Sequence, residues 1–232
     1  MKIPLQLTGL SLCALMVGAV SGQAQVQVGV SASALNNGYM NVFNLPSAGG
    51  GYQFGSGWGI PDLTANFAPT TLTLGPNTIG DPASYWYTPS GGPGAVGNKV
   101  MDANLYSETT GLYVGVNLTF AGTVLQNTLA GQLAQGNNVP WTTVAFIKDF
   151  DAGYNLIGTT TAALTPGDFN VSLLTSADPT HHIQYGFEVM GSDIWATDAG
   201  QYGTVVIVVP EPATLALAGL GAAALLAFRR RR

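Results

Sequence analysis

Alternation of apolar and polar residues constrains the fold of this chain more than any other feature. Successive side chains of a β-strand point to opposite faces, so a period of two is typical of a strand with one buried face. No window between residues 25 and 209 sustains the 3.6-residue apolar stripe of an amphipathic helix. The alternating segments span residues 26–34, 63–67, 72–74, 112–120, 169–173 and 183–189.

Two further segments, residues 141–147 and 205–209, are apolar at nearly every position. Such runs are typical of central strands that are covered on both faces. Glycine, proline, asparagine and aspartate separate the strands, and about ten strands of this kind suit one β-sandwich. The sequence therefore predicts an all-β domain, a single jelly-roll-like sandwich over residues 25–209. Within it, residues 36–59 are expected to form a long mobile loop.

The charge of this region excludes one class of partner. Lys99 and Lys148 are its only basic residues, against nine aspartates and two glutamates, which gives a net charge of −9. An acidic surface repels phosphate, and nucleic acid is therefore excluded as a partner.

The N-terminus has the composition of a secretory signal peptide. Lys2 precedes an apolar run at residues 10–20, and the small residues Gly22 and Ala24 suit cleavage after Ala24. Residues 1–24 are interpreted as this signal. The single cysteine, Cys13, lies inside it, so the mature chain is expected to contain no disulfide and no thiolate site.

The C-terminus combines three elements in a fixed order. Pro210, Glu211 and Pro212 come first, and residues 213–228 follow without a charge. These sixteen residues predict a short transmembrane helix of about 24 Å, and the prolines separate it from the folded domain. The positive-inside rule places the terminal arginines in the cytoplasm and the domain on the outer side of the inner membrane. These arginines are Arg229, Arg230, Arg231 and Arg232.

This tail, residues 210–232, resembles the PEP-CTERM sorting signal of Gram-negative bacteria. The resemblance implies an exosortase-type membrane protease as partner, with cleavage near Pro210, Glu211 and Pro212. It also implies transient anchoring in the inner membrane, followed by transfer to the cell surface or release, often in bacteria that make exopolysaccharide. A permanent single-pass anchor is the alternative interpretation.

The domain itself is similar to extracellular β domains that accompany PEP-CTERM tails, several of which are uncharacterised. This similarity implies no activity. It is carried by the segments at residues 58–63, 76–82, 97–101, 145–150 and 184–187.

Residues for nucleophilic or acid–base catalysis are sparse. His181 and His182 are adjacent and are expected to point different ways, so at most one could serve a given serine. We interpret both as solvent-facing loop residues. Glycoside hydrolysis needs two facing carboxylates. Glu108 and Glu188 are the only glutamates of the domain, and Glu188 is predicted to be a solvated strand residue that points away from the core.

Asp149 and Asp151 lie beside the turn residue Gly153. Carboxylates of this kind suit Ca²⁺, but the full loop pattern of ligands is missing. We interpret them as solvated acids of a hairpin turn and keep a structural Ca²⁺ as the lesser alternative, with no other cofactor or metal expected.

Exposed aromatic rings can stack on the apolar faces of sugars. The candidates are Tyr85, Trp86, Tyr87 and Trp195, with packing in the core as the alternative.

These observations favour a non-enzymatic exported protein of the cell surface or extracellular matrix, with a structural or interaction role. One alternative is a carbohydrate-binding module acting on exopolysaccharide. A second is a glycan-active enzyme that uses Glu188 with Glu108 or an aspartate.

Overall fold

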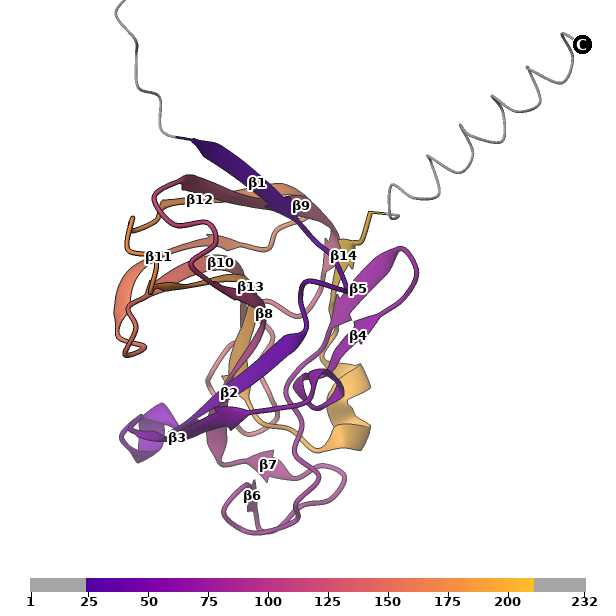
Figure 1. Ribbon diagram of the computed structural model, residues 1–232. Coiled ribbons are helices and arrows are strands. Elements are labelled where there is room, and N and C mark those ends of the chain that lie inside the picture. Colours follow the sequence, from indigo (N-terminus) through magenta and orange to yellow (C-terminus); the bar gives the residue numbers. More distant parts are fainter. Residues whose placement is uncertain (1–23, 211–232) are drawn as a thin grey trace, which may run out of the picture.

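Strands make up nearly all of the regular structure in residues 24–210, the part of the chain that the computed structural model describes. Sheet A contains β1 (Gln25–Gly29), β4 (Ala65–Phe67), β5 (Thr71–Leu74), β9 (Asn117–Asn127), β12 (Gly167–Leu174) and β14 (Val205–Val208). Sheet B contains β2 (Asn37–Asn44), β3 (Tyr52–Gly57), β8 (Lys99–Thr110), β10 (Thr142–Phe150), β11 (Leu156–Ala163) and β13 (His182–Ser192). The two sheets face each other (Figure 1), and the predicted all-β class is confirmed. The narrower jelly-roll description stays a prediction.

Short elements complete the described part of the chain. β6 (Tyr87–Thr88) and β7 (Val96–Gly97) form a two-stranded ribbon at one end of the sheets (Figure 1). The only helices among the described residues are three 3₁₀ segments: η1 (Pro46–Ala48), η2 (Ile60–Leu63) and η3 (Ala196–Gln201).

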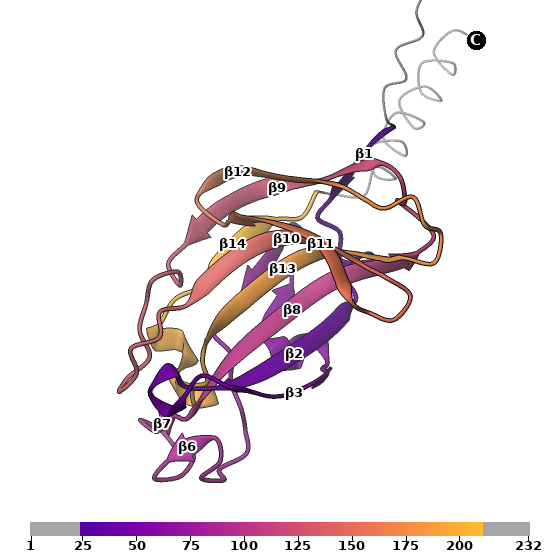
Figure 2. The same cartoon turned by 90° about the vertical axis from the view of Figure 1, so that its left-hand side faces the viewer.

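Sheet B is antiparallel throughout, in the order β11-β10-β13-β8-β2-β3, and Figure 2 shows its middle strands side by side. In sheet A, β9 pairs with β12 along one edge and with both β1 and β14 along the other. The first and last strands of the domain therefore share one neighbour. β1 runs parallel to β9, whereas the other strand pairs are antiparallel.

An aromatic cluster joins the two sheets. Phe120 of β9 lies 5.3 Å from Phe169 of β12, and 5.2 Å from both Tyr185 and Phe187 of β13, measured between ring centroids. All four side chains are buried. Inclined aromatic pairs add about 0.5–1.5 kcal/mol beyond the burial of their area. This cluster therefore fixes which face of β9 and of β13 points inward.

The strand predicted over residues 112–120 is wrong in its first half. β8 ends at Thr110 and β9 begins only at Asn117. Gly111 and Gly115 have φ values of 71° and 67°, a left-handed conformation that glycine adopts readily and that a strand does not contain. The segment between them is a turn, and Leu112 is exposed.

Other predicted boundaries also differ from the structure. The expected mobile loop at residues 36–59 is instead the hairpin of β2 and β3, closed by η1 and by Gly49 and Gly50, which both have positive φ. The first strand stops at Gly29, and a turn follows at residues 32–34. The longest strand, β8, lies outside the predicted strands, although its residues 101–105 alternate between apolar and polar.

The predicted terminal segments fall mostly outside the described residues. These are the signal peptide up to residue 23, the transmembrane helix at 213–228 and the basic tail at 229–232. Among the described residues, the first strand begins at Gln25, directly after the predicted cleavage site, and the Ala24 carbonyl accepts a hydrogen bond from the Asn117 N–H. Between residues 24 and 210, no helix has the length and apolar character needed to cross a membrane.

We expect Phe120→Ala to lower the free energy of unfolding by about 3–5 kcal/mol, because it leaves a cavity between the sheets. Leu125→Ala on the same strand is the control, since Leu125 is 55% exposed and should change stability by less than about 0.5 kcal/mol. Urea denaturation monitored by fluorescence measures both values. Equal losses for the two variants would contradict the role given to the cluster.

Candidate functional site

The outer face of sheet B, opposite the core, carries a group of polar and aromatic side chains. On β8, Met101, Ala103 and Leu105 are buried in the core, so the alternate residues of this strand point outward. The strand register places outward residues of neighbouring strands opposite these. Tyr39 pairs with Asn104, Asn41 with Asp102, Gln184 with Glu108, and Lys148 with Gln184.

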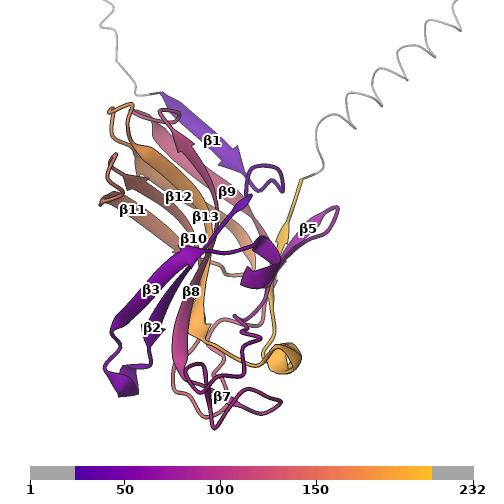
Figure 3. The ribbon, with the colours of Figure 1, turned by 60° about the horizontal axis from the view of Figure 1, so that its bottom comes forward.

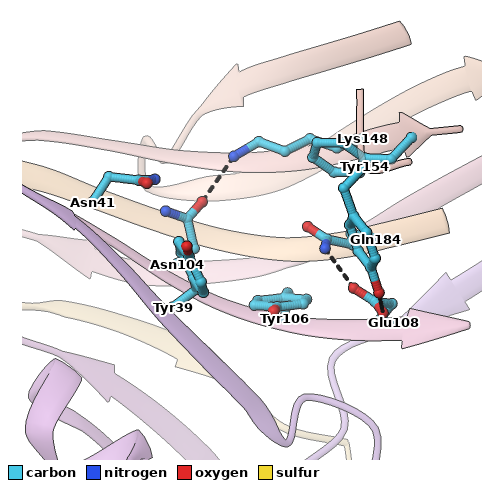
Figure 4. Close-up of a pocket in the computed structure, with 9 residues that line it drawn as sticks. Tyr39, Asn41, Asn104, Tyr106, Glu108, Lys148, Tyr154 and Gln184 are labelled. Atoms are coloured by element: carbon cyan, nitrogen blue, oxygen red, sulfur yellow. Dashed lines mark hydrogen bonds between the residues drawn. The ribbon is translucent and has the colours of Figure 1, made fainter. Parts of the chain in front are cut away.

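A pocket of about 580 Å³ lies on this face (Figure 4). Its volume is within the range of about 300–1,000 Å³ that is usual for small-molecule sites. Residues of β2, β8, β10, β13 and the β10–β11 turn line it: Tyr39, Asn41, Asn104, Tyr106, Glu108, Lys148, Phe150, Tyr154 and Gln184.

One wall of the pocket is fixed by hydrogen bonds to Glu108. Its two carboxylate oxygens accept from the Tyr154 hydroxyl at 2.9 Å and from Gln184 Nε2 at 2.6 Å. The Tyr154 ring also stacks on His182, with 4.1 Å between centroids and 10° between planes. Asp151 holds the turn that carries Tyr154, because its carboxylate accepts from the backbone N–H groups of Gly153 and Asn155.

The other side of the pocket is built around Lys148. Its ammonium group donates to Asn104 Oδ1 at 2.8 Å and to Glu188 Oε2 at 3.2 Å. Asn104 in turn donates to Asp102 Oδ1 at 2.7 Å, and Asn41 donates to Asp102 Oδ2 at 3.0 Å. Burial, together with the negative charge of Glu188, raises the pKa of Asp102 to about 6, although Lys148 and the two amides act in the opposite direction.

Two glycines lie next to tyrosines of the pocket. A Cβ atom at Gly186 would collide with the β8 backbone, at the Leu105 carbonyl oxygen and at 2.7 Å from Tyr106 Cα, so glycine at this position lets β8 and β13 pair closely. A Cβ atom at Gly55 of β3 would come within 2.8 Å of the Tyr39 hydroxyl, and the Tyr39 side chain would have to move.

The aromatic residues that the sequence proposed for sugar binding lie outside this pocket and do not share one surface. Tyr87 is fully buried, and its hydroxyl lies within hydrogen-bond distance of two backbone carbonyl oxygens in the core, Ile79 at 2.7 Å and Ile194 at 2.8 Å. Trp195 is half-buried against the Tyr87 ring, at 5.5 Å. Tyr85 is exposed and contacts the half-buried Trp86 at 4.8 Å. Sugar binding by Tyr85, Trp86 and Trp195 stays a prediction.

The two histidines point in different directions, as expected, but they are not solvent-facing loop residues. His181 is 8% exposed, and its Nδ1 lies 2.6 Å from Asp149 Oδ1. His182 begins β13, and its Nδ1 lies 2.8 Å from the Thr110 hydroxyl. Both rings are held by hydrogen bonds and packing.

Asp149 and Asp151, the two candidate metal ligands, form hydrogen bonds with different groups. Asp149 is buried, so its interpretation as a solvated acid is wrong, and it accepts from the Ser176 N–H in addition to its contact with His181. Asp151 is engaged in its own turn. Within residues 24–210, no group of three or more His, Cys, Asp or Glu side chains is arranged to hold a metal ion.

Glu188 points away from the core, as predicted, and it shares the outer face with Glu108. The register pairs Glu188 with Asn104 and Glu108 with Gln184, so the two glutamates are separated by four positions along β8 and β13. At about 3.3 Å per residue this is roughly 13 Å. Paired glycosidase carboxylates are about 5–9.5 Å apart. Glu108 lines the pocket, whereas Glu188 forms its ion pair beside it.

The end of the domain leads directly into the C-terminal tail. β14 ends at Val208, and the Val209 N–H still donates to the Thr70 carbonyl at 2.8 Å. Residues 208–232 match the PEP-CTERM protein-sorting motif. The motif supports export of this chain and processing by an exosortase, a membrane protease. Of the motif residues discussed above, Pro210 is described, whereas Glu211, Pro212 and the four arginines lie outside the described residues. Neither the curated proteins nor the solved structures contain a match to the chain.

We expect Asp102 to titrate near pH 6 in the native protein. Removing the negative charge with Glu188→Gln should lower this pKa, and removing the positive charge with Lys148→Met should raise it. Carbon-13 NMR of the aspartate carboxyl groups measures these pKa shifts. The exposed Asp151 is the internal reference, and hydrogen bonds from Asn155 hold its pKa below the usual value. A titration of Asp102 below pH 4 in the unmodified protein would contradict the described geometry.

Proposed function

We propose that this chain is a non-enzymatic protein of the cell surface or extracellular matrix whose domain binds a neutral carbohydrate. One observation carries the proposal: the pocket on the outer face of sheet B combines tyrosine rings with amide and carboxylate groups. Rings of this kind pack against the apolar faces of sugars, while amides and carboxylates pair with sugar hydroxyls. The sorting motif supports a location where such polymers occur.

Free hydrogen-bonding groups in the pocket suit this ligand. The hydroxyls of Tyr39 and Tyr106 have no hydrogen-bond partner among the described side chains and backbone groups, so both can donate to a ligand or accept from it. Burial, with a smaller effect of the Glu108 charge, raises the pKa of Tyr106 to about 12 and keeps its hydroxyl protonated.

Charge favours a neutral sugar over an anionic one. The pocket contains one acid, Glu108, and one base, Lys148, and the base is already paired with Glu188 outside the pocket lining. The surrounding domain has a net charge of −9. Uronates, sulfates and phosphates would meet a repulsive field. A neutral exopolysaccharide is therefore the proposed partner, and no cofactor is needed for this role.

Binding fits the pocket better than hydrolysis. Glu108 is the only carboxylate that lines it among the described residues. Asp102 has the raised pKa of a general acid, but both of its oxygens accept hydrogen bonds from Asn41 and Asn104. No second carboxylate faces Glu108 across the pocket, and a pair on opposite sides of a sugar is what hydrolysis requires.

We expect Tyr154→Ala to weaken glycan binding about tenfold, because the lost ring contributes stacking of the order of 1.4 kcal/mol. Tyr85→Ala is the matched comparison, because Tyr85 is an exposed tyrosine outside the pocket and belongs to the alternative sugar-binding candidates; if the pocket is the site, this variant leaves the affinity unchanged. A glycan array identifies the ligand, and titration calorimetry of the full chain in detergent measures the affinities. An array without any neutral-glycan binding, or a loss confined to Tyr85→Ala, would contradict the proposal.

We further propose that the tail anchors the protein only transiently in the inner membrane, through a helix at residues 213–228. Glu211→Ala should then block processing, so that the variant keeps its tail and stays in the membrane fraction. Wild type should lose the tail and reach the surface or the medium. Mass spectrometry of the C-terminus after fractionation distinguishes the two forms. A tail retained in both proteins would mean a permanent anchor.

A further inference from the structure

We propose that the carbohydrate site extends from the pocket along β2 to the aromatic pair Phe43 and Tyr52, so that the ligand is a linear polysaccharide chain rather than a single sugar. This inference rests on the proposed function and names the class of ligand. The pocket covers only the Tyr39 end of β2, and the outer face continues beyond it.

The register of β2 places its aromatic residues on one line. Tyr39, Asn41 and Phe43 pair with Asn104, Asp102 and Val100 of β8, without an irregularity between them. Because side chains alternate, all three point to the outer face. Tyr39 and Asn41 line the pocket, and Phe43 is the next outward residue along the strand.

A β-bulge brings a second ring to the same place. β2 and β3 shift register between Val42 and Phe43, since Val42 pairs with Phe54 but Phe43 pairs with Tyr52. Without this shift, Gln53 would lie opposite Phe43. Bulges often reorient a side chain in this way near functional sites. The two rings meet with centroids 5.5 Å apart and planes inclined by 68°.

The pair is accessible and lies beyond one end of the pocket. Tyr52 is 57% exposed, and Figure 3 shows β2 and β3 together at the margin of the sheet. Phe43 is two residues beyond Asn41, which lines the pocket, but it pairs with Val100, eight positions along β8 from Glu108. At roughly 3.3 Å per residue this is about 26 Å. A single sugar bound against Glu108 and Tyr154 therefore cannot reach the pair, whereas a chain of several sugars can.

The opposite face of β3 offers a matched comparison. Phe54 is 36% exposed, but it packs against Trp86 with centroids 6.2 Å apart and pairs with Val42, which is buried in the core. Phe54 therefore belongs to the side of β3 that faces away from the proposed path. Tyr52 and Phe54 differ mainly in the face that they occupy.

The test uses cello- and chito-oligosaccharides, from disaccharide to hexasaccharide, titrated into the full chain in detergent. We expect the affinity of wild type to rise with chain length. Tyr52→Ala should weaken hexasaccharide binding about tenfold and leave disaccharide binding unchanged, because only the longer chain reaches the lost ring. Phe54→Ala should bind both as wild type does. Thermal unfolding of each variant checks that it is folded.

Four results would overturn the extension. Disaccharide and hexasaccharide could bind wild type with equal affinity, or Tyr52→Ala could weaken the binding of both by the same factor. Either result would confine the ligand to the pocket and leave the proposed function intact. Alternatively, Tyr52→Ala could dissociate an oligomer in size-exclusion chromatography, which would assign this face to a second copy of the chain. Absence of binding at every length would remove the proposed function and the extension together.

Discussion

The packing of Phe120 against Tyr185 and Phe187 is the contact on which the rest of this domain depends. It decides which side of β13 faces sheet A. Since a strand has a side-chain period of two, a register slip by one residue would reverse both faces. The odd-numbered residues of β13 are therefore held in the core, and Gln184 and Glu188 must lie on the outer face. The packing of the core thus determines which side chains of β13 face the pocket.

The pocket follows from this constraint together with local features. Gly186 lets β8 and β13 pair closely, and Gly55 leaves space for the Tyr39 ring. The Asp151 turn presents Tyr154, and Lys148 links the polar groups at the other side. Each polar side chain of the pocket is oriented by a neighbour or left free for a ligand. The acidic charge of the domain and the pairing of Lys148 with Glu188 are the reasons for which we propose a neutral, hydroxyl-rich ligand.

The sequence predicted the class of the fold and the sorting tail, but not the pocket. Strands such as β12 and β13 alternate cleanly, and the tail is a contiguous motif, so both can be recognised locally. The turn at Gly111 and Gly115 was missed because alternation continues through it. The pocket residues lie on separate strands between positions 39 and 184, and only the register brings them together. By contrast, the contiguous aromatics from Tyr85 to Tyr87 predict a sugar-binding surface, although Tyr87 packs in the core.

The most direct test of the central claim, that the outer face of sheet B is the binding surface, is a map of amide NMR shifts on adding the glycan selected by the array. Our account predicts that the perturbed amides cluster on β2, β8, β10 and β13 around the pocket, with sheet A unaffected. Perturbations confined to sheet A, or to the region of Trp86 and Trp195, would contradict it.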